Sequence, residues 1–247
     1  MEIADLRAGV LRAQEPLAPH TVHVWRTALS AITCVADEMK TLLSADEQIR
    51  AERFRFPEHR HAFIVARALL RMILGAYCRC APEDLRFTYG NQGKPGIDEA
   101  ASRLSRTVSF NLSHSTKSLQ IAVAAEAALG IDIEDCSRDF DVDGLMAECL
   151  TQEEARPLNS LSAEQRRNAF LRHWVHKEAF LKCAGTGFSV SPKEVHVSFG
   201  DGGRSEMRCS NPMADAVLLG RDLETDPGHL AAIATTDRDY ELQFIVF

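Results

Sequence analysis

The feature that most constrains the fold of this chain is an internal repeat with a nearly constant spacing. Five segments in the first half have similar partners 107 to 111 residues further on, in the same order. Each pair alone is weakly similar, but the shared order and spacing indicate a duplication. The paired segments are TVHVW (21–25) with GIDIE (130–134), LSADEQ (43–48) with LTQEEA (150–155), AFIVARALLRMIL (62–74) with AFLRHWVHKEAFL (169–181), LRFTYG (85–90) with VHVSFG (195–200), and SLQIAVA (118–124) with HLAAIAT (229–235).

The repeat predicts two similar α+β halves, residues 1–128 and 129–247, related by a pseudo-two-fold. We expect each half to contain an opening strand, a short helix, a long amphipathic helix and closing antiparallel strands. Ligands favour clefts between packed halves of this kind. The sequence therefore predicts a ligand cleft at the seam between the halves.

Both short helices are predicted to begin at a capping box. Ser44 and Thr151 are the expected caps, and Glu47 and Glu154 follow three residues later. In this pattern the cap side chain accepts from a backbone N–H, while the acid accepts from the N–H of the cap residue. The same start signal in both halves supports the duplication.

Composition narrows the class of protein. At 247 residues and 45% hydrophobic, the chain can build a substantial core. Its formal net charge of −7 argues against nonspecific nucleic-acid binding. No apolar run approaches the roughly 20 residues that span a bilayer, and the first residues do not resemble a secretory signal. We therefore expect a cytoplasmic protein without nucleic-acid or membrane partners.

The cysteines are odd in number and scattered, which predicts free thiols in a reducing compartment. Only Cys78 and Cys80 lie close in sequence, and no second cluster completes a zinc site. The seven are Cys34, Cys78, Cys80, Cys136, Cys149, Cys183 and Cys209.

Positive charge is concentrated in one stretch of six arginines within 22 residues. A solvated helix face and a phosphate-binding surface are both compatible with this pattern. The residues are Arg50, Arg53, Arg55, Arg60, Arg67 and Arg71.

The strand GIDIE presents two carboxylates on one face. Side chains alternate along a strand, so Asp132 and Glu134 point one way while Ile131 and Ile133 point into the core. Mg²⁺ commonly takes one or two carboxylates together with phosphate oxygens and water. A metal site and an ordinary polar face of an edge strand both remain open from these residues alone.

The predicted helix HWVHKEAFLK (173–182) places three chemically useful side chains along one side. Trp174, Glu178 and Lys182 are spaced four residues apart. Glu178 can supply a third carboxylate near the acidic strand, and Lys182 can hold a phosphate. The alternative is a core tryptophan beside an ordinary helix ion pair.

Two loop segments add candidate phosphate contacts. In FNLSHS (110–115), the adjacent Ser113 and His114 face opposite sides of an extended chain, so they suit a phosphate better than a nucleophile–base dyad. In the predicted turn NQGKP (91–95), Lys94 projects from a loop, as ordinary surface lysines also do.

Taken in order, four motifs resemble those of the 4'-phosphopantetheinyl transferases, specifically the larger, monomeric surfactin-synthetase type. The resemblance implies a pseudo-two-fold α+β fold with coenzyme A held between the halves. It implies Mg²⁺-dependent transfer of the 4'-phosphopantetheine group to a serine of an apo acyl or peptidyl carrier protein, with release of adenosine 3',5'-bisphosphate. The motifs are Asn91…Gly93-Lys94-Pro95, FNLSHS (110–115), GIDIE (130–134) and Trp174…Lys177-Glu178-Ala179…Lys182.

The resemblance also implies roles by position. Asp132, Glu134 and Glu178 match the magnesium ligands of the family. Glu178 is in addition the candidate base, and Lys182 matches a lysine near the reacting phosphates, so the expected catalytic residues are Glu178, Lys182 and Asp132. The expected contacts to coenzyme A are Lys182, Ser113 and His114 at its phosphates, Lys94 and Arg67 near its adenosine end, and Arg50 at its 3'-phosphate.

Some positions depart from the family pattern. Glu47 stands where some members have a lysine, one turn before Arg50 on the same predicted helix. Leu150 stands where Phe is common, and residues 98–106 form an expected surface insertion. Three alternatives remain: a coenzyme A-binding module without activity, a regulatory protein that kept the fold, and another magnesium-dependent diphosphate hydrolase. The carrier, the acyl-coenzyme A tolerance and the choice between Mg²⁺ and Mn²⁺ are left open, and the duplication favours a monomer.

Overall fold

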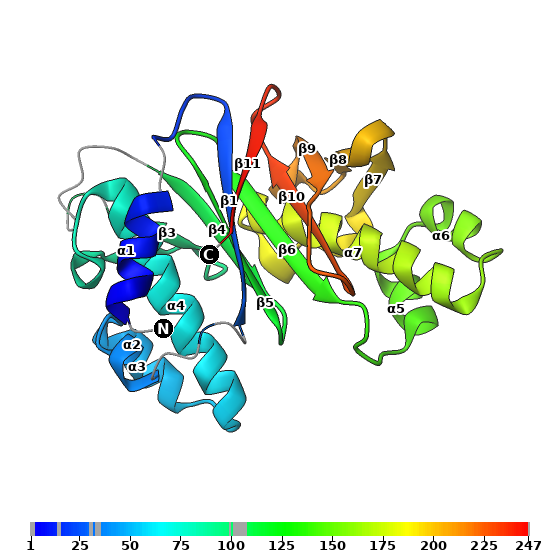
Figure 1. The fold of residues 1–247 in the computed structure, drawn as a ribbon. Helices are drawn as coiled ribbons and strands as arrows, with labels where there is room; N and C mark the ends of the chain where they lie inside the picture. Colours follow the sequence, from blue (N-terminus) through cyan, green and yellow to red (C-terminus); the bar gives the residue numbers. More distant parts are fainter. Residues whose placement is uncertain are drawn as a thin grey trace.

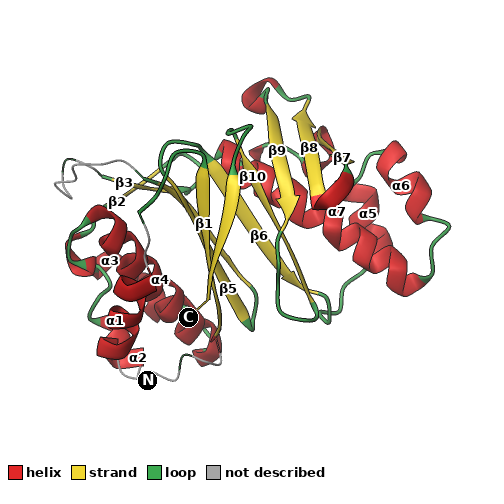
Figure 2. Cartoon of the chain, turned by 45° about the horizontal axis from the view of Figure 1, so that its top comes forward, coloured by secondary structure: helices red, strands yellow, loops and turns green. Residues whose placement is uncertain are grey.

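Strands form the middle of the protein, and helices gather at its two ends (Figures 1 and 2). A computed structural model describes residues 3–13, 16–29, 32, 36–98, 100 and 108–246. Helices α1 to α4 lie on one side of the strands, and α5 to α7 lie on the other (Figure 1). This mixture of helices with mainly antiparallel strands is the predicted α+β class.

The first part of the chain follows the predicted order of elements. The opening strand, the long helix and the closing strand of this part all lie where the repeat predicted them. The elements are α1 (Ile3–Ala13), β1 (Thr21–Ala28), α2 (Ala36–Lys40), α3 (Ala45–Glu52), α4 (Pro57–Cys78), β2 (Phe87–Tyr89), β3 (Pro95–Ile97), β4 (Ser109–His114) and β5 (Ser118–Ala124).

The second part has a matching series of an opening strand, helices and antiparallel strands. Its elements are β6 (Leu129–Asp135), α5 (Val142–Cys149), α6 (Gln152–Leu158), α7 (Ala163–Ala184), β7 (Val195–Phe199), β8 (Arg204–Cys209), β9 (Val217–Asp222), β10 (His229–Thr235) and β11 (Glu241–Val246). Most of the expected insertion at residues 98–106 lies outside the described residues.

The helix starts agree with the predicted capping signals. In α3 the backbone N–H of Ser44 donates to Oε2 of Glu47 at 3.0 Å. In α6 the N–H of Thr151 donates to Oε2 of Glu154 at 2.9 Å, and the N–H of Glu154 donates to the Thr151 hydroxyl at 3.2 Å. Each box satisfies backbone donors that a helix start leaves open.

Helix α4 is longer and more apolar than we expected of any segment. By length and composition alone, Pro57–Cys78 could cross a membrane, but 83% of its most apolar window is buried inside the protein. A core helix passes the same composition test. Arg67 and Arg71, two of its buried residues, pair with Glu47 of α3, as a helix packed within the protein allows.

The strands form two principal sheets whose orders correspond. The first runs β11-β1-β5-β4, the second β6-β10-β9-β8-β7, and β2 and β3 form a separate hairpin. The three neighbouring strands β1-β5-β4 of the first sheet correspond to β6-β10-β9 of the second, because in each set the opening strand lies beside the closing strand. Strand β11 pairs in parallel with β1. Residues of the predicted second half therefore complete the sheet of the first half, which the repeat did not predict.

An apolar cluster joins the two sheets. It includes Val22 and Val24 of β1, Ala122 of β5, and Ile131 and Ile133 of β6. The polar side chains of β6 are thereby left to face away from this core. We call the contact between β4 (Ser109–His114) and β6 (Leu129–Asp135) the seam.

Candidate functional site

A cleft of about 1270 Å³ lies along the seam and reaches α3, α4 and the end of α7. Seven of the residues singled out in the sequence line it, although they come from five different elements. They are Arg50, Arg67, Ser113, His114, Asp132, Glu134 and Lys182. The chemistry therefore collects between the two sheets, as the repeat predicted.

Strand β6 divides its side chains as expected. Ile131 and Ile133 are buried in the apolar cluster, while Asp132 and Glu134 line the cleft. Burial, followed by the charge of Asp132, raises the pKa of the Glu134 carboxyl above its ordinary value. Two carboxylates on one face of a strand are thus held close together.

Lys182 of α7 binds the acidic strand. Its Nζ donates to Asp132 Oδ1 at 2.6 Å, to Ser113 Oγ at 3.1 Å and to the carbonyl of Ile131 at 3.2 Å. The Ser113 hydroxyl donates to the same Asp132 oxygen at 2.9 Å. The ordinary helix ion pair between Glu178 and Lys182 is absent from the ion pairs of the described residues.

Trp174 and Glu178 also face the acids of β6. The Trp174 indole N–H donates to Glu134 Oε1 at 3.1 Å. Burial raises the pKa of Glu178 to about 7, and the negative charges of Asp132 and Glu134 add to that shift while Lys182 opposes it. The three acids therefore influence one another, and Glu178 has a pKa suited to proton transfer near neutral pH.

The acids leave oxygens free for a hard cation. Asp132 Oδ2 and Glu178 Oε1 are buried and accept no hydrogen bond from any residue that the structure describes. Across that same part of the chain, no group of three or more His, Cys, Asp or Glu side chains is already gathered in a metal-holding arrangement. Since Mg²⁺ usually keeps phosphate and water ligands, carboxylates that do not form a complete cage still fit it chemically.

A cationic wall faces the acids from α3 and α4. Glu47 is buried, and its Oε1 accepts from Arg67 Nε at 2.7 Å while its Oε2 accepts from Arg71 Nε at 2.7 Å. Burial raises the pKa of Glu47, but the charge of Arg67 and the hydrogen bond from Arg71 outweigh it, so the pKa lies below its ordinary value. One buried acid thus orients two guanidinium groups, and Arg67 lines the cleft.

Some arginines of the 50–71 stretch line the cleft or are buried, as a phosphate-binding surface requires, and others form a solvated face. Arg67 and Arg71 are buried with Glu47, and Arg50 is exposed but lines the cleft, with its guanidinium 5.4 Å from the centre of the Phe63 ring. The remaining three, Arg53, Arg55 and Arg60, are exposed. Tyr89, at the cleft wall, accepts a hydrogen bond from Arg67 Nη2 at 3.3 Å.

Lys94 and Glu178 are the two predicted site residues that do not line the cleft in the described structure. The Nζ of Lys94 donates to the carbonyls of Leu129 at 3.1 Å and Cys183 at 3.0 Å. Burial lowers the pKa of its ammonium group. The sequence could not distinguish a lysine that contacts a ligand from one that donates to backbone carbonyls, because in either case the lysine lies at the tip of the same turn.

Ser113 and His114 do not form a dyad. Ser113 is buried against Asp132, whereas His114 is exposed, and its ring Nδ1 lies 3.3 Å from the carbonyl oxygen of Ser115. The alternation of side chains along β4 accounts for this separation, as predicted.

The sequence did not predict a buried ion pair behind the site, because its partners belong to different helices. Lys177 is fully buried, and its Nζ donates to Glu154 Oε2 at 2.7 Å and to the carbonyls of Pro192 and Val195 at 3.1 and 2.6 Å. Glu154 Oε1 accepts from the N–H of Val197 at 2.9 Å. The capping box signals Glu154, but nothing in the pattern signals its partner.

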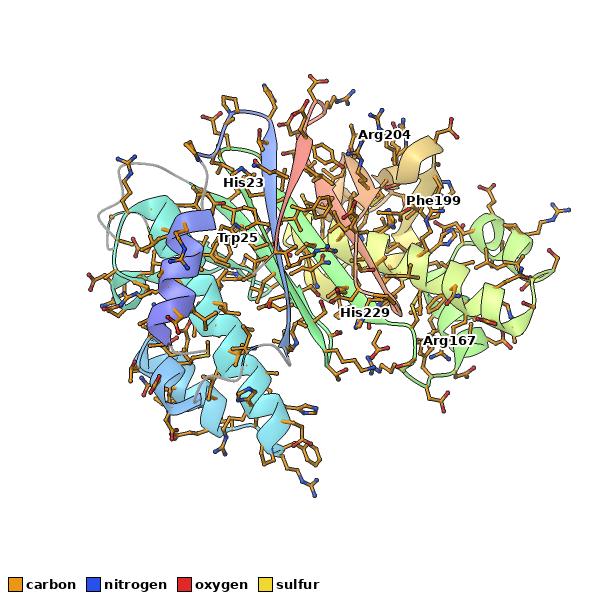
Figure 3. The ribbon with its side chains drawn as sticks, viewed as in Figure 1. His23, Trp25, Arg167, Phe199, Arg204 and His229 are labelled. Atoms are coloured by element: carbon orange, nitrogen blue, oxygen red, sulfur yellow. The ribbon has the colours of Figure 1, made fainter. Side chains whose placement is uncertain are left out.

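Two contacts at the mouth of the cleft were also missed. Lys117 Nζ lies 2.9 Å from Asp135 Oδ2. His229, labelled between the two groups of helices in Figure 3, has its Nε2 3.1 Å from Ser115 Oγ. Hydrogen bonds from Ser137 and Lys117 hold the pKa of Asp135 well below its ordinary value. These contacts tie the turn after β4 to the second sheet.

The described cysteines are all free thiols, in agreement with the sequence. Cys34 lies outside the described residues. The others are Cys78, Cys80, Cys136, Cys149, Cys183 and Cys209.

Comparison with protein families gives two adjoining matches. Residues 25–127 match the model described as 4'-phosphopantetheinyl transferase, N-terminal. Residues 128–238 match the model of the 4'-phosphopantetheinyl transferase superfamily.

Curated proteins with related sequences carry the same family name. The 4'-phosphopantetheinyl transferase HetI of Nostoc sp. is 37% identical over 168 residues, which is 68% of this chain and 70% of HetI. The protein slr0495 of Synechocystis sp. is 35% identical over 156 residues, 63% of this chain and 62% of that protein. The 4'-phosphopantetheinyl transferase Sfp of Bacillus subtilis is 22% identical over 204 residues, 83% of this chain and 87% of Sfp.

Proposed function

Because this chain belongs to the 4'-phosphopantetheinyl transferase superfamily, we propose that it transfers the 4'-phosphopantetheine group of coenzyme A to a serine of an apo acyl or peptidyl carrier protein. Adenosine 3',5'-bisphosphate is the other product. The observation that carries the proposal is the cleft in which Lys182, Ser113 and the acids of β6 meet opposite the guanidinium of Arg67.

The two walls of the cleft suit the two ends of coenzyme A. Arg67 and the exposed Arg50 would receive the adenosine end, with Arg50 reaching the 3'-phosphate. Ser113, His114 and Lys182 would contact the diphosphate, since hydroxyl, imidazole and ammonium groups all donate to phosphate oxygens. We assign Lys94 no contact to the coenzyme, because its ammonium group binds two backbone carbonyls.

The reaction is a phosphoryl transfer. The serine oxygen of the carrier forms a bond to the β-phosphorus, and the bond from that phosphorus to the bridging oxygen breaks. The leaving adenosine 3',5'-bisphosphate keeps the electron pair. Glu178, with its pKa raised to about 7, takes the serine proton, and Lys182 stabilises the charge on the phosphate oxygens.

We also propose that Mg²⁺ is held by Asp132, Glu134 and Glu178, two of which carry a buried oxygen without a hydrogen bond from the described residues. When bound, the ion would supply Lewis-acid neutralisation of the diphosphate charge. The protein's own contribution is positioning and charge, which dominate phosphoryl transfer generally.

A further part of the proposal concerns organisation. Residues 1–128 and 129–247 are proposed to be pseudo-two-fold halves, supported by the shared strand order and the two capping boxes. The monomeric state, the cytoplasmic location and the lack of nucleic-acid and membrane partners remain predictions of the sequence.

The direct test is incubation of the chain with coenzyme A, Mg²⁺ and several apo carrier proteins, followed by intact-mass measurement of each carrier. We expect one carrier to gain a single phosphopantetheine, and the same carrier with its acceptor serine changed to alanine to gain none. Coenzyme A binding without any mass gain would instead identify a binding module. Cleavage of coenzyme A without a carrier would identify a diphosphate hydrolase.

A further inference from the structure

The outer edge of β6 is held by side chains instead of by another strand. Strand β6 ends the five-stranded sheet and pairs with β10 on its inner edge. In an antiparallel pair, alternate residues turn their backbone N–H and C=O groups away from the partner. Here Leu129, Ile131 and Ile133 turn these groups toward the seam.

Four side chains satisfy the groups along this edge. Two are acceptors for backbone N–H groups and two are donors to backbone carbonyls, and they come from β4, from the turn before β3 and from α7. The contacts are Lys94 Nζ to Leu129 O at 3.1 Å, Ile131 N to Asn111 Oδ1 at 2.9 Å, Lys182 Nζ to Ile131 O at 3.2 Å, and Ile133 N to Ser113 Oγ at 3.4 Å.

Asn111 differs from the residues that serve the site directly. It is 5% exposed, and it does not line the cleft in the described structure, whereas Ser113 and Lys182 do. Its amide oxygen holds the N–H of Ile131, the residue immediately before Asp132. A buried N–H without an acceptor is unfavourable. Removal of the amide oxygen would therefore favour movement of β6 toward water or another partner, and Asp132 would move with it.

We propose that Asn111 is a positioning residue for the transfer reaction: it fixes the outer edge of β6 so that Asp132 stays within reach of Lys182 and Ser113. The proposal rests on the proposed function. It assigns a purpose to the asparagine of the FNLSHS segment, for which the sequence suggested none. Small displacements at a reacting centre are costly, since about 1 Å can reduce a rate by about 100-fold.

The test compares Asn111→Leu, which keeps the approximate shape but lacks the acceptor, with Asn111→Asp, which keeps an oxygen at the same place. Thr235→Val is a matched control, because the buried Thr235 hydroxyl also accepts one backbone N–H, that of Asp237 at 3.1 Å. Three quantities are measured for each variant: kcat, KM for coenzyme A, and amide hydrogen exchange at Ile131 and Ile133.

For Asn111→Leu we expect kcat to fall about 10- to 100-fold while KM changes about threefold or less. Exchange at Ile131 should be at least about tenfold faster and exchange at Ile133 much less affected. Asn111→Asp should restore slow exchange at Ile131, and Thr235→Val should keep kcat within about twofold.

A kcat for Asn111→Leu equal to that of the wild-type chain would overturn the proposal. So would equally faster exchange at every amide of β6 in both Asn111 variants, which indicates general destabilisation. A wild-type chain that modifies no carrier would refute the proposed function instead, and the exchange rate at Ile131 would still decide whether Asn111 holds β6.

Discussion

The α3–α4 and α6–α7 regions place a buried glutamate against a long helix in the same way, but they neutralise it differently. Glu47 accepts from two arginines of α4, Arg67 and Arg71. Glu154 accepts from one lysine of α7, Lys177, which also donates to two carbonyls. The shared arrangement is a capped short helix that delivers a carboxylate to the long helix behind it.

The difference decides which charge each long helix offers to the cleft. Matching 62–74 with 169–181 places Arg71 opposite Glu178 and Arg67 opposite Trp174. In α7 the cation for the buried acid comes from Lys177, one residue earlier. Position 178 is therefore free to carry an acid that faces β6. One scaffold thus gives a cationic wall in one region and an acidic wall in the other.

The strongest way to break this comparison is Lys177→Met, which leaves Glu154 buried without its cation. We expect the free energy of unfolding to fall by about 3–5 kcal/mol, because an unpaired buried charge is costly. Urea denaturation measures this. Lys40→Met is the control, since Lys40 pairs with the exposed Glu52 at 2.8 Å and exposed ion pairs contribute little to stability. Equal losses for the two variants would contradict the structural role of Lys177.

Glu178→Gln tests whether position 178 is catalytic instead of structural. The transfer rate should fall by at least about 100-fold. The melting temperature should stay constant or rise, because the buried Oε1 of Glu178 accepts no hydrogen bond from the described residues. Initial rates of carrier modification and thermal unfolding provide the two measurements. Glu164→Gln, in the first turn of the same helix, should change neither, and near-normal turnover of Glu178→Gln would remove it from the mechanism.

Gly130→Ala tests how closely α7 must approach the acidic strand. A Cβ at this position would lie 2.1 Å from the Ala179 carbonyl oxygen and 2.4 Å from the Cys183 nitrogen, so helix and strand must separate. We expect a loss of about 1–3 kcal/mol in unfolding free energy together with slower transfer. Gly9→Ala is the control, since its added Cβ meets nothing within 4 Å. Unchanged stability of Gly130→Ala would show that the helix moves without cost.

The smallest expected effect is on acid stability. Burial raises the pKa of Glu154, but the charge and hydrogen bond of Lys177 outweigh it, so its pKa lies below the ordinary value of 4.5. A lowered carboxyl pKa adds stability above about pH 4.5, and that stability is lost as the pH falls. Between about pH 5 and 3, the free energy of unfolding of the wild-type chain should fall by on the order of 1 kcal/mol more than that of Glu154→Gln. Parallel curves from denaturation at each pH would exclude this contribution.

Local patterns predicted the elements well because they depend on neighbours in the sequence. Strands β5 (Ser118–Ala124) and β10 (His229–Thr235) have the predicted bounds, and the alternation in GIDIE correctly assigned the faces of Asp132 and Glu134. These inferences need only the periodicity of a strand and the backbone donors of a helix start.

Contacts between distant segments were beyond such patterns. The ammonium group of Lys94 binds carbonyls of Leu129 and Cys183, although its loop position equally suited a ligand. The pairing of Lys177 with Glu154 depends on how α6 packs against α7. The partners of a long, flexible side chain are set by tertiary packing, which the repeat constrains only coarsely.

The parallel pairing of β11 with β1 has a consequence for the order in which the protein can be assembled during translation. Residues 241–246 leave the ribosome long after the other strands of their sheet, yet they form the outer strand of the sheet that begins at residue 21. Domains usually fold as units from the amino terminus as they emerge. Here the first-made sheet stays incomplete until residues 241–246 have emerged, so the outer edge of β1 has no partner strand before then.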